Sequence, residues 1–151
     1  MNASSFFTKE QQSAILASVI AAEEATSGEI RVHIEKTCKE DVLDRSAWLF
    51  KTLGMDKTAL RNGVLFYLAV EDKKFAILGD AGINKVVPAD FWDKISTILQ
   101  NNFKEGNFTE GLSEGIRLAG EQLKAHFTHM GADDKNELPD TISFDNPNEK
   151  E

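Results

Sequence analysis

The chain has 151 residues, and its 17 basic and 25 acidic side chains give a formal charge of −8. This length fits one domain with a substantial core, and 41% hydrophobic with 28% charged residues is a soluble globular composition that excludes general disorder. The acidic balance argues against nucleic acid and anionic membranes as partners, because both require clustered lysine and arginine.

The first third of the chain predicts a helix, a strand and a second helix. Thr8 and Gln11 have the spacing of a capping box, and the helical apolar pattern that follows them ends at Gly28. Polar and apolar residues alternate over 29–35, which predicts a half-buried strand. Helical spacing returns over 41–54, where a glycine again marks the end.

The middle of the chain predicts a β-hairpin. Residues 63–70 form a continuous apolar run, as expected of a central strand buried on both faces. A short polar turn at 71–73 leads into a third strand over 74–78, so these two strands should be antiparallel. Two helices should follow, one over 88–103 and one over 109–127.

This order of elements predicts a single α/β domain over residues 1–130, with a mixed sheet sandwiched between helical layers. The strand–helix–strand crossover makes strands 29–35 and 63–70 parallel. Residues 131–151 carry seven acidic and two basic side chains and no periodicity, which predicts an acidic, flexible tail that adds little core stability. Apolar residues within 138–144 nevertheless give this tail a way to dock on the body.

Three loops should meet at one end of the sheet, because parallel strands begin where the antiparallel strand ends. Carboxylate and amide oxygens gather there, and these are the ligands that a hard divalent cation prefers. The alternative is that these carboxylates have only structural roles. Asp90 and Asp93 would then interact with the positive end of a helix dipole, and Asp80 would cap a turn. The candidate metal ligands are Glu29, Asp80, Asp90 and Asp93, with the Asn62 amide in reserve.

Other catalytic groups are scarce. Six residues separate Cys38 from Arg45, more than a cysteine-phosphatase loop allows, so this single cysteine is expected to be a structural strand-end residue. His126 and His129 near a helix end are expected to interact with the helix dipole rather than share a metal. His33 is expected on the polar face of its strand.

Several short segments resemble one known family, in family order over residues 8–127. They are Thr26-Ser27-Gly28-Glu29-Ile30, Arg61-Asn62-Gly63-Val64-Leu65, Leu78-Gly79-Asp80-Ala81-Gly82-Ile83, Val87-Pro88-Ala89-Asp90-Phe91-Trp92, Phe103-Lys104-Glu105-Gly106 and Gly111-Leu112. This pattern resembles the TPM domain family, which includes a thylakoid protein implicated in photosystem repair and many bacterial proteins.

The resemblance implies a mixed sheet between helical layers, a divalent-cation site in the acidic loops and an acid phosphatase activity. It points to Glu29, Asp80 and Asp93 as ligands of Ca²⁺ or Mg²⁺, with Asp90 as a further candidate. The start of the chain lacks a signal-peptide pattern, and no run reaches the roughly 20 apolar residues of a membrane span. With one cysteine and an acidic tail like that of a soluble bacterial subgroup, the chain is expected to be cytoplasmic.

Two functions remain open from the sequence. The first is a metal-dependent phosphatase acting on small phosphomonoesters, with Arg61 as the one obvious cation for a substrate phosphate. The second is a non-catalytic, metal-stabilised module that binds a protein partner. In either case we expect a monomer without nucleic-acid binding or membrane insertion.

Overall fold

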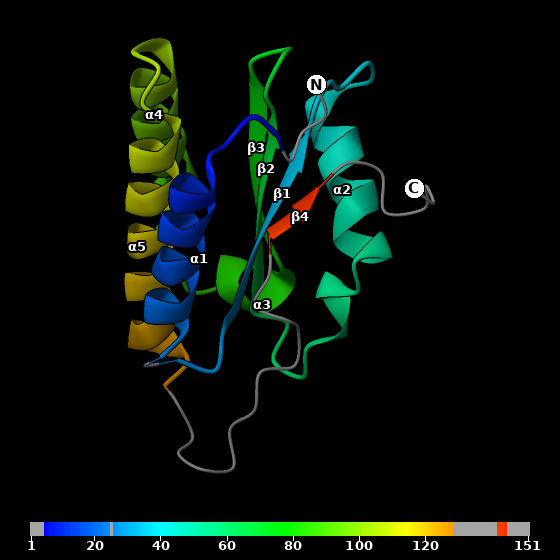
Figure 1. The fold of residues 1–151 in the computed structure, drawn as a ribbon. Coiled ribbons are helices and arrows are strands. Elements are labelled where there is room, and N and C mark those ends of the chain that lie inside the picture. Colours follow the sequence, from blue (N-terminus) through cyan, green and yellow to red (C-terminus); the bar gives the residue numbers. More distant parts are fainter. Residues whose placement is uncertain (1–4, 25, 129–141, 145–151) are drawn as a thin grey trace.

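A four-stranded mixed sheet forms the centre of the computed structural model, which describes residues 5–24, 26–128 and 142–144. The strand order is β3-β2-β1-β4 (Figure 1). The strands are β1 (Glu29–Glu35), β2 (Gly63–Ala69), β3 (Lys74–Gly79) and β4 (Ile142–Phe144). β1 and β2 are parallel and β3 is antiparallel to β2, which confirms the predicted pairing.

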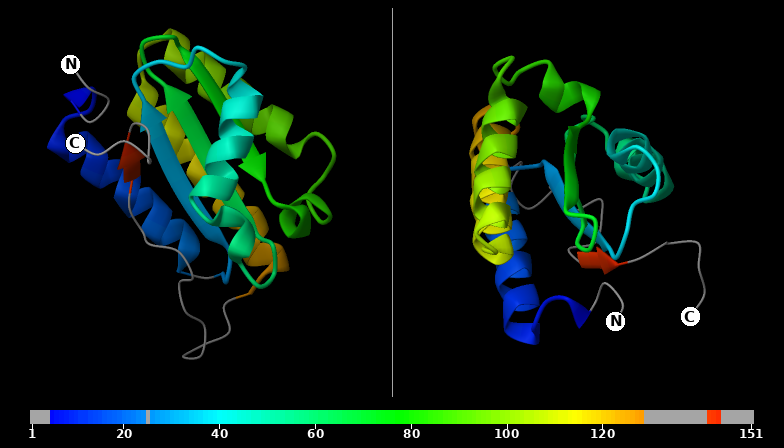
Figure 2. Two further views of the ribbon diagram at one scale, coloured as in Figure 1. Left: turned by 90° about the vertical axis from the view of Figure 1, so that its right-hand side faces the viewer. Right: turned by 90° about the horizontal axis from the view of Figure 1, so that it is seen from above.

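Helices cover both faces of the sheet. Three of them form a layer on one face and α2 lies on the other, so the predicted sandwich is confirmed (Figures 1 and 2). The helices are α1 (Lys9–Glu23), α2 (Val42–Thr52), α3 (Ala81–Asn84), α4 (Phe91–Lys104) and α5 (Phe108–His126), with a 3₁₀ helix, η2 (Met55–Lys57). The three-helix layer contains α1, α4 and α5, and the short α3 follows β3 at one end of the sheet.

Two apolar clusters fill the spaces between these layers. Val64, Phe66 and Leu68 of β2 pack in the cluster under the three helices. Leu65 and Tyr67 of the same strand pack on the α2 side. Every residue of β2 is buried, so the continuous apolar run forms a central strand, as predicted.

Strand β1 differs from its predicted half-buried character. Its polar positions lie on the face of the sheet that points to the α2 side, and Glu29, His33 and Glu35 are only 1%, 0% and 5% exposed. The expected polar face is therefore an internal one. Alternation in a strand shows which residues share a face, but it cannot show whether another element covers that face.

The helix boundaries follow local capping chemistry. Thr8 and Gln11 form the predicted capping box, with reciprocal hydrogen bonds of 2.9 and 3.0 Å. The helix expected from Pro88 instead begins at Phe91, after a turn in which Phe91 N–H donates to the Pro88 carbonyl. An unpredicted helix, α3, forms because Asp80 caps it by accepting from Ala81 N–H.

The fourth strand comes from the segment predicted as a tail. Ile142 and Phe144 pack at the edge of the three-helix cluster, and β4 runs parallel to β1. This is the docking that the apolar residues within 138–144 suggested. The other residues of the 131–151 tail, like His129, lie outside the described residues.

Candidate functional site

The three predicted loops meet at the end of the sheet beside α3, at the bottom of Figure 1. Glu29 N–H donates to the Asn62 carbonyl at 3.4 Å, which joins the starts of β1 and β2. Asp80 N–H donates to the Gly63 carbonyl at 2.9 Å, which joins the end of β3 to the start of β2. Topology therefore brings these loops together as expected.

An ion pair between Arg61 and Asp80 dominates this end of the sheet. Arg61 Nε and Nη2 donate to Asp80 Oδ2 and Oδ1 at 2.7 and 2.8 Å. Asp80 Oδ1 also accepts from Ala81 N–H at 2.7 Å. The carboxylate is buried while the arginine side chain is 52% exposed, and the hydrogen bond to Asp80 raises the pKa of Arg61. Asp80 is thus already bound to a cationic side chain.

The backbone holds Arg61 in an unusual conformation. Its φ of 52° lies in the left-handed region, which is uncommon for a residue other than glycine. Gly82 N–H donates to the Arg61 carbonyl at 2.8 Å, and a Cβ at Gly82 would lie 2.1 Å from the Leu60 carbonyl oxygen. Only glycine fits this approach, so α3 packs directly on the loop that carries the arginine.

Two further polar side chains are buried beside this pair. Asn62 is 1% exposed, and its Nδ2 donates weakly to Ser27 Oγ at 3.4 Å. Its Oδ1 is buried and accepts no hydrogen bond from the described part of the chain. Glu29 is also 1% exposed, but β2 separates it from Asp80, so their backbones lie about 10 Å apart. A buried amide oxygen without a donor is a group that needs a ligand or water.

The remaining predicted ligands lie on the surface. Asp90 precedes α4 without a side-chain cap, and it forms an exposed ion pair with Lys94 at 3.4 Å. Asp93 is exposed in the first turn of α4. In the described residues, no three or more His, Cys, Asp or Glu side chains are grouped so that they could hold a metal. The four predicted ligands therefore do not form a preformed metal site.

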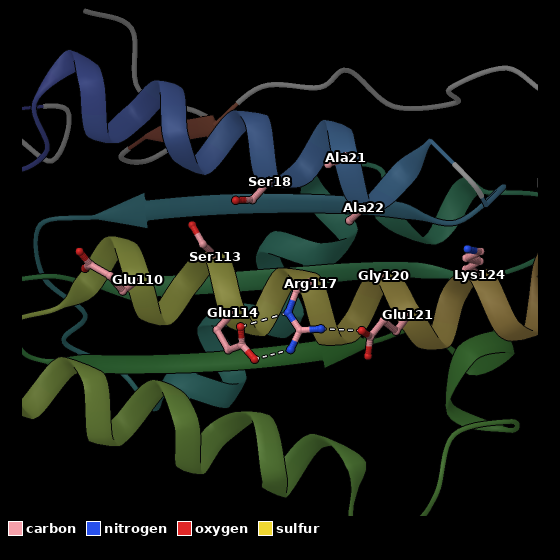
Figure 3. A pocket seen from close by; sticks show the side chains of 10 residues that line it. All are labelled: Ser18, Ala21, Ala22, Glu110, Ser113, Glu114, Arg117, Gly120, Glu121 and Lys124. Carbon is pink, nitrogen blue, oxygen red and sulfur yellow. Dashed lines mark hydrogen bonds and ion pairs between the residues drawn. The ribbon is translucent and has the colours of Figure 1, made fainter.

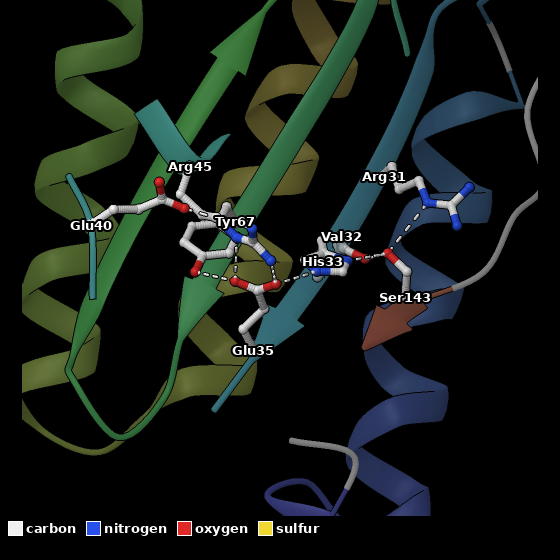
Figure 4. A network of polar contacts seen from close by, with 8 residues as sticks. All are labelled: Arg31, Val32, His33, Glu35, Glu40, Arg45, Tyr67 and Ser143. Carbon is white, nitrogen blue, oxygen red and sulfur yellow. Dashed lines mark hydrogen bonds and ion pairs between the residues drawn. The ribbon is translucent and has the colours of Figure 1, made fainter. Parts of the chain in front are cut away.

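A second polar centre was not predicted from the sequence. The Glu35 carboxylate lies between α2 and the sheet, and three side chains surround it (Figure 4). Tyr67 O–H donates to Glu35 Oε1 at 2.6 Å, and Arg45 Nε donates to the same oxygen at 2.9 Å. Arg45 Nη2 and His33 Nε2 lie 2.5 and 3.2 Å from Oε2.

The contacts of this centre determine the charge of Glu35. Burial by itself would raise its pKa, but the hydrogen bonds from His33, Arg45 and Tyr67 outweigh burial and lower the pKa to about 2. Burial and the hydrogen bond to Glu35 raise the pKa of Tyr67. Glu35 is therefore ionised and Tyr67 neutral near pH 7. The polar alternation of β1 was the available signal, but Tyr67 lies in an apolar run that gave no sign of a polar partner.

Other residues considered for chemistry have structural partners. Cys38 is buried, its N–H donates to Asp72 at 2.7 Å and its thiol to the Glu40 carbonyl at 3.3 Å, which fits the predicted structural role. Arg45 stacks over Trp48 at 4.7 Å. His126 is exposed in the last turn of α5, where a cation favours the helix dipole.

A surface groove of about 610 Å³ lies between α1 and α5 (Figure 3). Arg117 of α5 lines it and pairs with Glu114 and Glu121 of the same helix, each at 2.5 Å. Small residues and charged residues line the groove: Ser18, Ala21, Ala22, Ser113, Gly120, Glu110, Glu114, Arg117, Glu121 and Lys124. Three of its charged residues, Glu114, Arg117 and Glu121, thus pair with one another along α5.

The fold and the loop cluster together define a TPM domain. A family model for the TPM domain matches residues 1–122, and this chain belongs to that family. The chain is similar to the BA42 protein of the psychrophilic bacterium Bizionia argentinensis, with 53% identity and a TM-score of 0.83. This likeness covers 91% of this chain and 94% of that one.

Two more distant structures share the fold alone. The N-terminal domain of cg2496 from Corynebacterium glutamicum has 12% identity and a TM-score of 0.64, over 79% of this chain and 75% of that one. The N-terminal domain of a protein from P. gingivalis has 20% identity and a TM-score of 0.65, over 82% of each chain. Among curated proteins, none matches the chain. None of the described helices combines the length and apolar character needed to cross a membrane.

Proposed function

We propose that this TPM domain binds one divalent cation, Ca²⁺ or Mg²⁺, at the α3 end of the sheet and acts there as a metal-dependent phosphomonoesterase. The buried Asn62 Oδ1, which accepts no hydrogen bond from the described residues, carries the proposal. It lies in the loop cluster that also holds the buried carboxylates of Glu29 and Asp80, and hard cations prefer such oxygens. Asp90 and Asp93 remain candidate ligands from the adjoining helix end.

Arg61 and a divalent cation compete for the same carboxylate, that of Asp80. Both oxygens of Asp80 accept hydrogen bonds from Arg61, and the positive charge of the guanidinium repels a second cation. Cation binding at Asp80 therefore requires Arg61 to move away from it. The freed guanidinium, on a half-exposed side chain, has the planar fork that binds phosphate oxygens. A bound divalent cation would supply polarisation of the phosphoryl oxygen and a lowered pKa for a bound water.

Cation binding can be tested apart from catalysis. Titration of Ca²⁺ or Mg²⁺ should raise the melting temperature and shift the amide NMR signals near Gly28, Asp80 and Asp93. Asp80→Asn should abolish the shifts, whereas Arg61→Gln should keep or strengthen cation binding because the competing charge is gone. Shifts confined to Asp133 and Asp134 of the tail, or no shifts at millimolar cation, would refute the site.

Catalysis needs a second assay on the same variants. Hydrolysis of p-nitrophenyl phosphate by the cation-loaded protein should be lost in Asp80→Asn and reduced about 100-fold or more in Arg61→Gln. The matched control is Arg117→Gln, which removes an exposed arginine that pairs with carboxylates on α5 instead of in the loop cluster. Equal turnover by Arg61→Gln and Arg117→Gln would exclude a phosphate-binding role for Arg61.

The alternative function is a non-catalytic, metal-stabilised interaction module. The groove between α1 and α5 favours it, because small residues there leave room for another protein segment. Cation binding without any hydrolysis, in the two assays above, would favour this module over the enzyme.

A further inference from the structure

The outer edge of β1 is paired with a C-terminal segment. On one side β2 pairs with β1 from Glu29 to Glu35, and on the other side the described residues of β4 pair with Val32, His33 and Ile34. The N–H and C=O groups of an edge strand are a template for an added strand. The three described residues at this edge, Ile142–Phe144, are only half-buried.

The side chains of β4 alternate between two environments. Ile142 and Phe144 lie beside Val32 and Ile34 and pack against the three-helix cluster. Ser143 faces the α2 side, where its Oγ lies 2.6 Å from His33 Nδ1 (Figure 4). A slip of one residue would place an apolar side chain against the imidazole, so the edge selects a register.

The polar centre behind His33 makes this position selective for a hydroxyl. Ionised Glu35 can only accept, so His33 Nε2 donates to it, and Nδ1 faces Ser143 Oγ at 2.6 Å. The same hydroxyl donates to the Val32 carbonyl at 3.4 Å and accepts from Arg31 Nε at 3.5 Å. His33 is fully buried, so an apolar residue here would leave Nδ1 without a partner.

We propose that the β1 edge at residues 32–34 is a binding site for extended segments of the pattern apolar–Ser/Thr–apolar. In this proposal β4 is the occupant from the same chain, and a partner protein that presents the pattern displaces it by adding a parallel strand. Displacement is feasible because the three described residues of β4 are only half-buried, so little apolar surface holds them on the edge. A second copy of this chain offers the same segment, which competes poorly with the tethered one.

The test uses variants of the full-length chain in which β4 binds the β1 edge more weakly or equally well. Ser143→Ala removes the hydroxyl, and Ser143→Thr is the matched variant that keeps it. The probes are a synthetic peptide with the sequence of residues 138–148 and the same peptide with alanine at the Ser143 position. In the Ser143→Ala chain, the serine peptide should shift the amide signals of Val32, His33 and Ile34 and saturate. The alanine peptide should bind about tenfold more weakly, and the Ser143→Thr chain should bind the serine peptide more weakly than Ser143→Ala does.

Three results would overturn the proposal. Equal affinity for both peptides would show that the edge does not distinguish serine from alanine. Unmoved signals at residues 32–34, or loss of cooperative unfolding in Ser143→Ala, would show that β4 is a fixed part of the core. Concentration-dependent dimers of the wild-type chain with the same shifted signals would assign the edge to a second copy instead of a partner protein.

Discussion

Glu35 shows how one buried carboxylate can organise side chains from three elements. It accepts from Tyr67 of β2 and Arg45 of α2, and it contacts His33 on its own strand. Each bond replaces water that the carboxylate lost on burial, so the ionised form is retained inside the protein. The pKa of about 2 is the consequence, and it links this residue to the pH dependence of stability.

We predict that the fold loses stability as the pH falls from about 4.5 to about 2. The pKa of Glu35 is depressed in the folded state, so its stabilising effect is complete above the unfolded pKa of about 4.3 and disappears as the carboxylate is protonated. Urea unfolding at about pH 7, 4.5, 3 and 2 should show this decline. Glu35→Gln should flatten it and cost about 3 kcal/mol at pH 7, because the largely buried Arg45 keeps only the exposed carboxylate of Glu40, 3.6 Å away.

Glu114→Gln is the control for this prediction. Glu114 also accepts from an arginine, Arg117, and the hydrogen bond likewise lowers its pKa, but the pair is exposed on α5. Solvent screens such a pair, so the variant should change stability little at any pH. An equally steep pH dependence in Glu35→Gln and the wild type would show that other carboxylates control acid unfolding.

At the scale of the helices, Gly120 of α5 lies against Ala22 of α1. A Cβ added there would lie 2.6 Å from the Cβ of Ala22 and 3.1 Å from its Cα. These atoms belong to a rigid residue of the facing helix, so they cannot rotate away as a long side chain could. The pairing of glycine with alanine therefore sets the distance between the two helices that flank the groove of Figure 3.

We predict that Gly120→Ala destabilises the protein by about 1–3 kcal/mol, although alanine is the better helix former. Ala22→Gly should cost about 0.5–1 kcal/mol by itself through backbone entropy. The double variant should be more stable than the sum of the two effects, because it moves one methyl group across the same contact. Strict additivity in thermal or urea unfolding would mean that the helices adjust without strain.

At the scale of the whole molecule, the C-terminal segment adds a three-residue strand to the edge of the sheet. Of residues 131–151, the structure describes only Ile142–Phe144, and these three are half-buried at one edge of the sheet. The main clusters are built from residues before Phe127, chiefly from β2 and the helices on either side of it. The core is therefore expected to persist without this segment.

Deletion of residues 131–151 should lower the melting temperature by only a few degrees. A chain of this size shifts by roughly 2–8 °C for each kcal/mol, and three half-buried residues contribute little more than that. Differential scanning calorimetry of the truncated and full-length chains would measure the difference. Loss of the cooperative transition would place Ile142 and Phe144 in the essential core.

Local patterns were sufficient to predict most elements of this domain. The capping box at Thr8, the apolar run over 63–70 and the short turn before β3 each involve neighbours in the chain, and each element formed as expected. Strand direction followed from the same patterns, because crossovers and hairpins have fixed geometry. The convergence of the loops at Glu29, Asn62 and Asp80 could therefore also be predicted.

Only the tertiary structure decided which partner each polar side chain finds. Three such pairs join residues that are 19 or more positions apart: Arg61 with Asp80, Tyr67 with Glu35, and Ser143 with His33. Periodicity in one segment cannot reveal such pairs, because burial and hydrogen bonding depend on which elements pack together. The sequence alone established the sheet, its helical layers and a cluster of acidic loops. Packing then determined that one of those carboxylates holds an arginine and that an apparently polar strand face is internal.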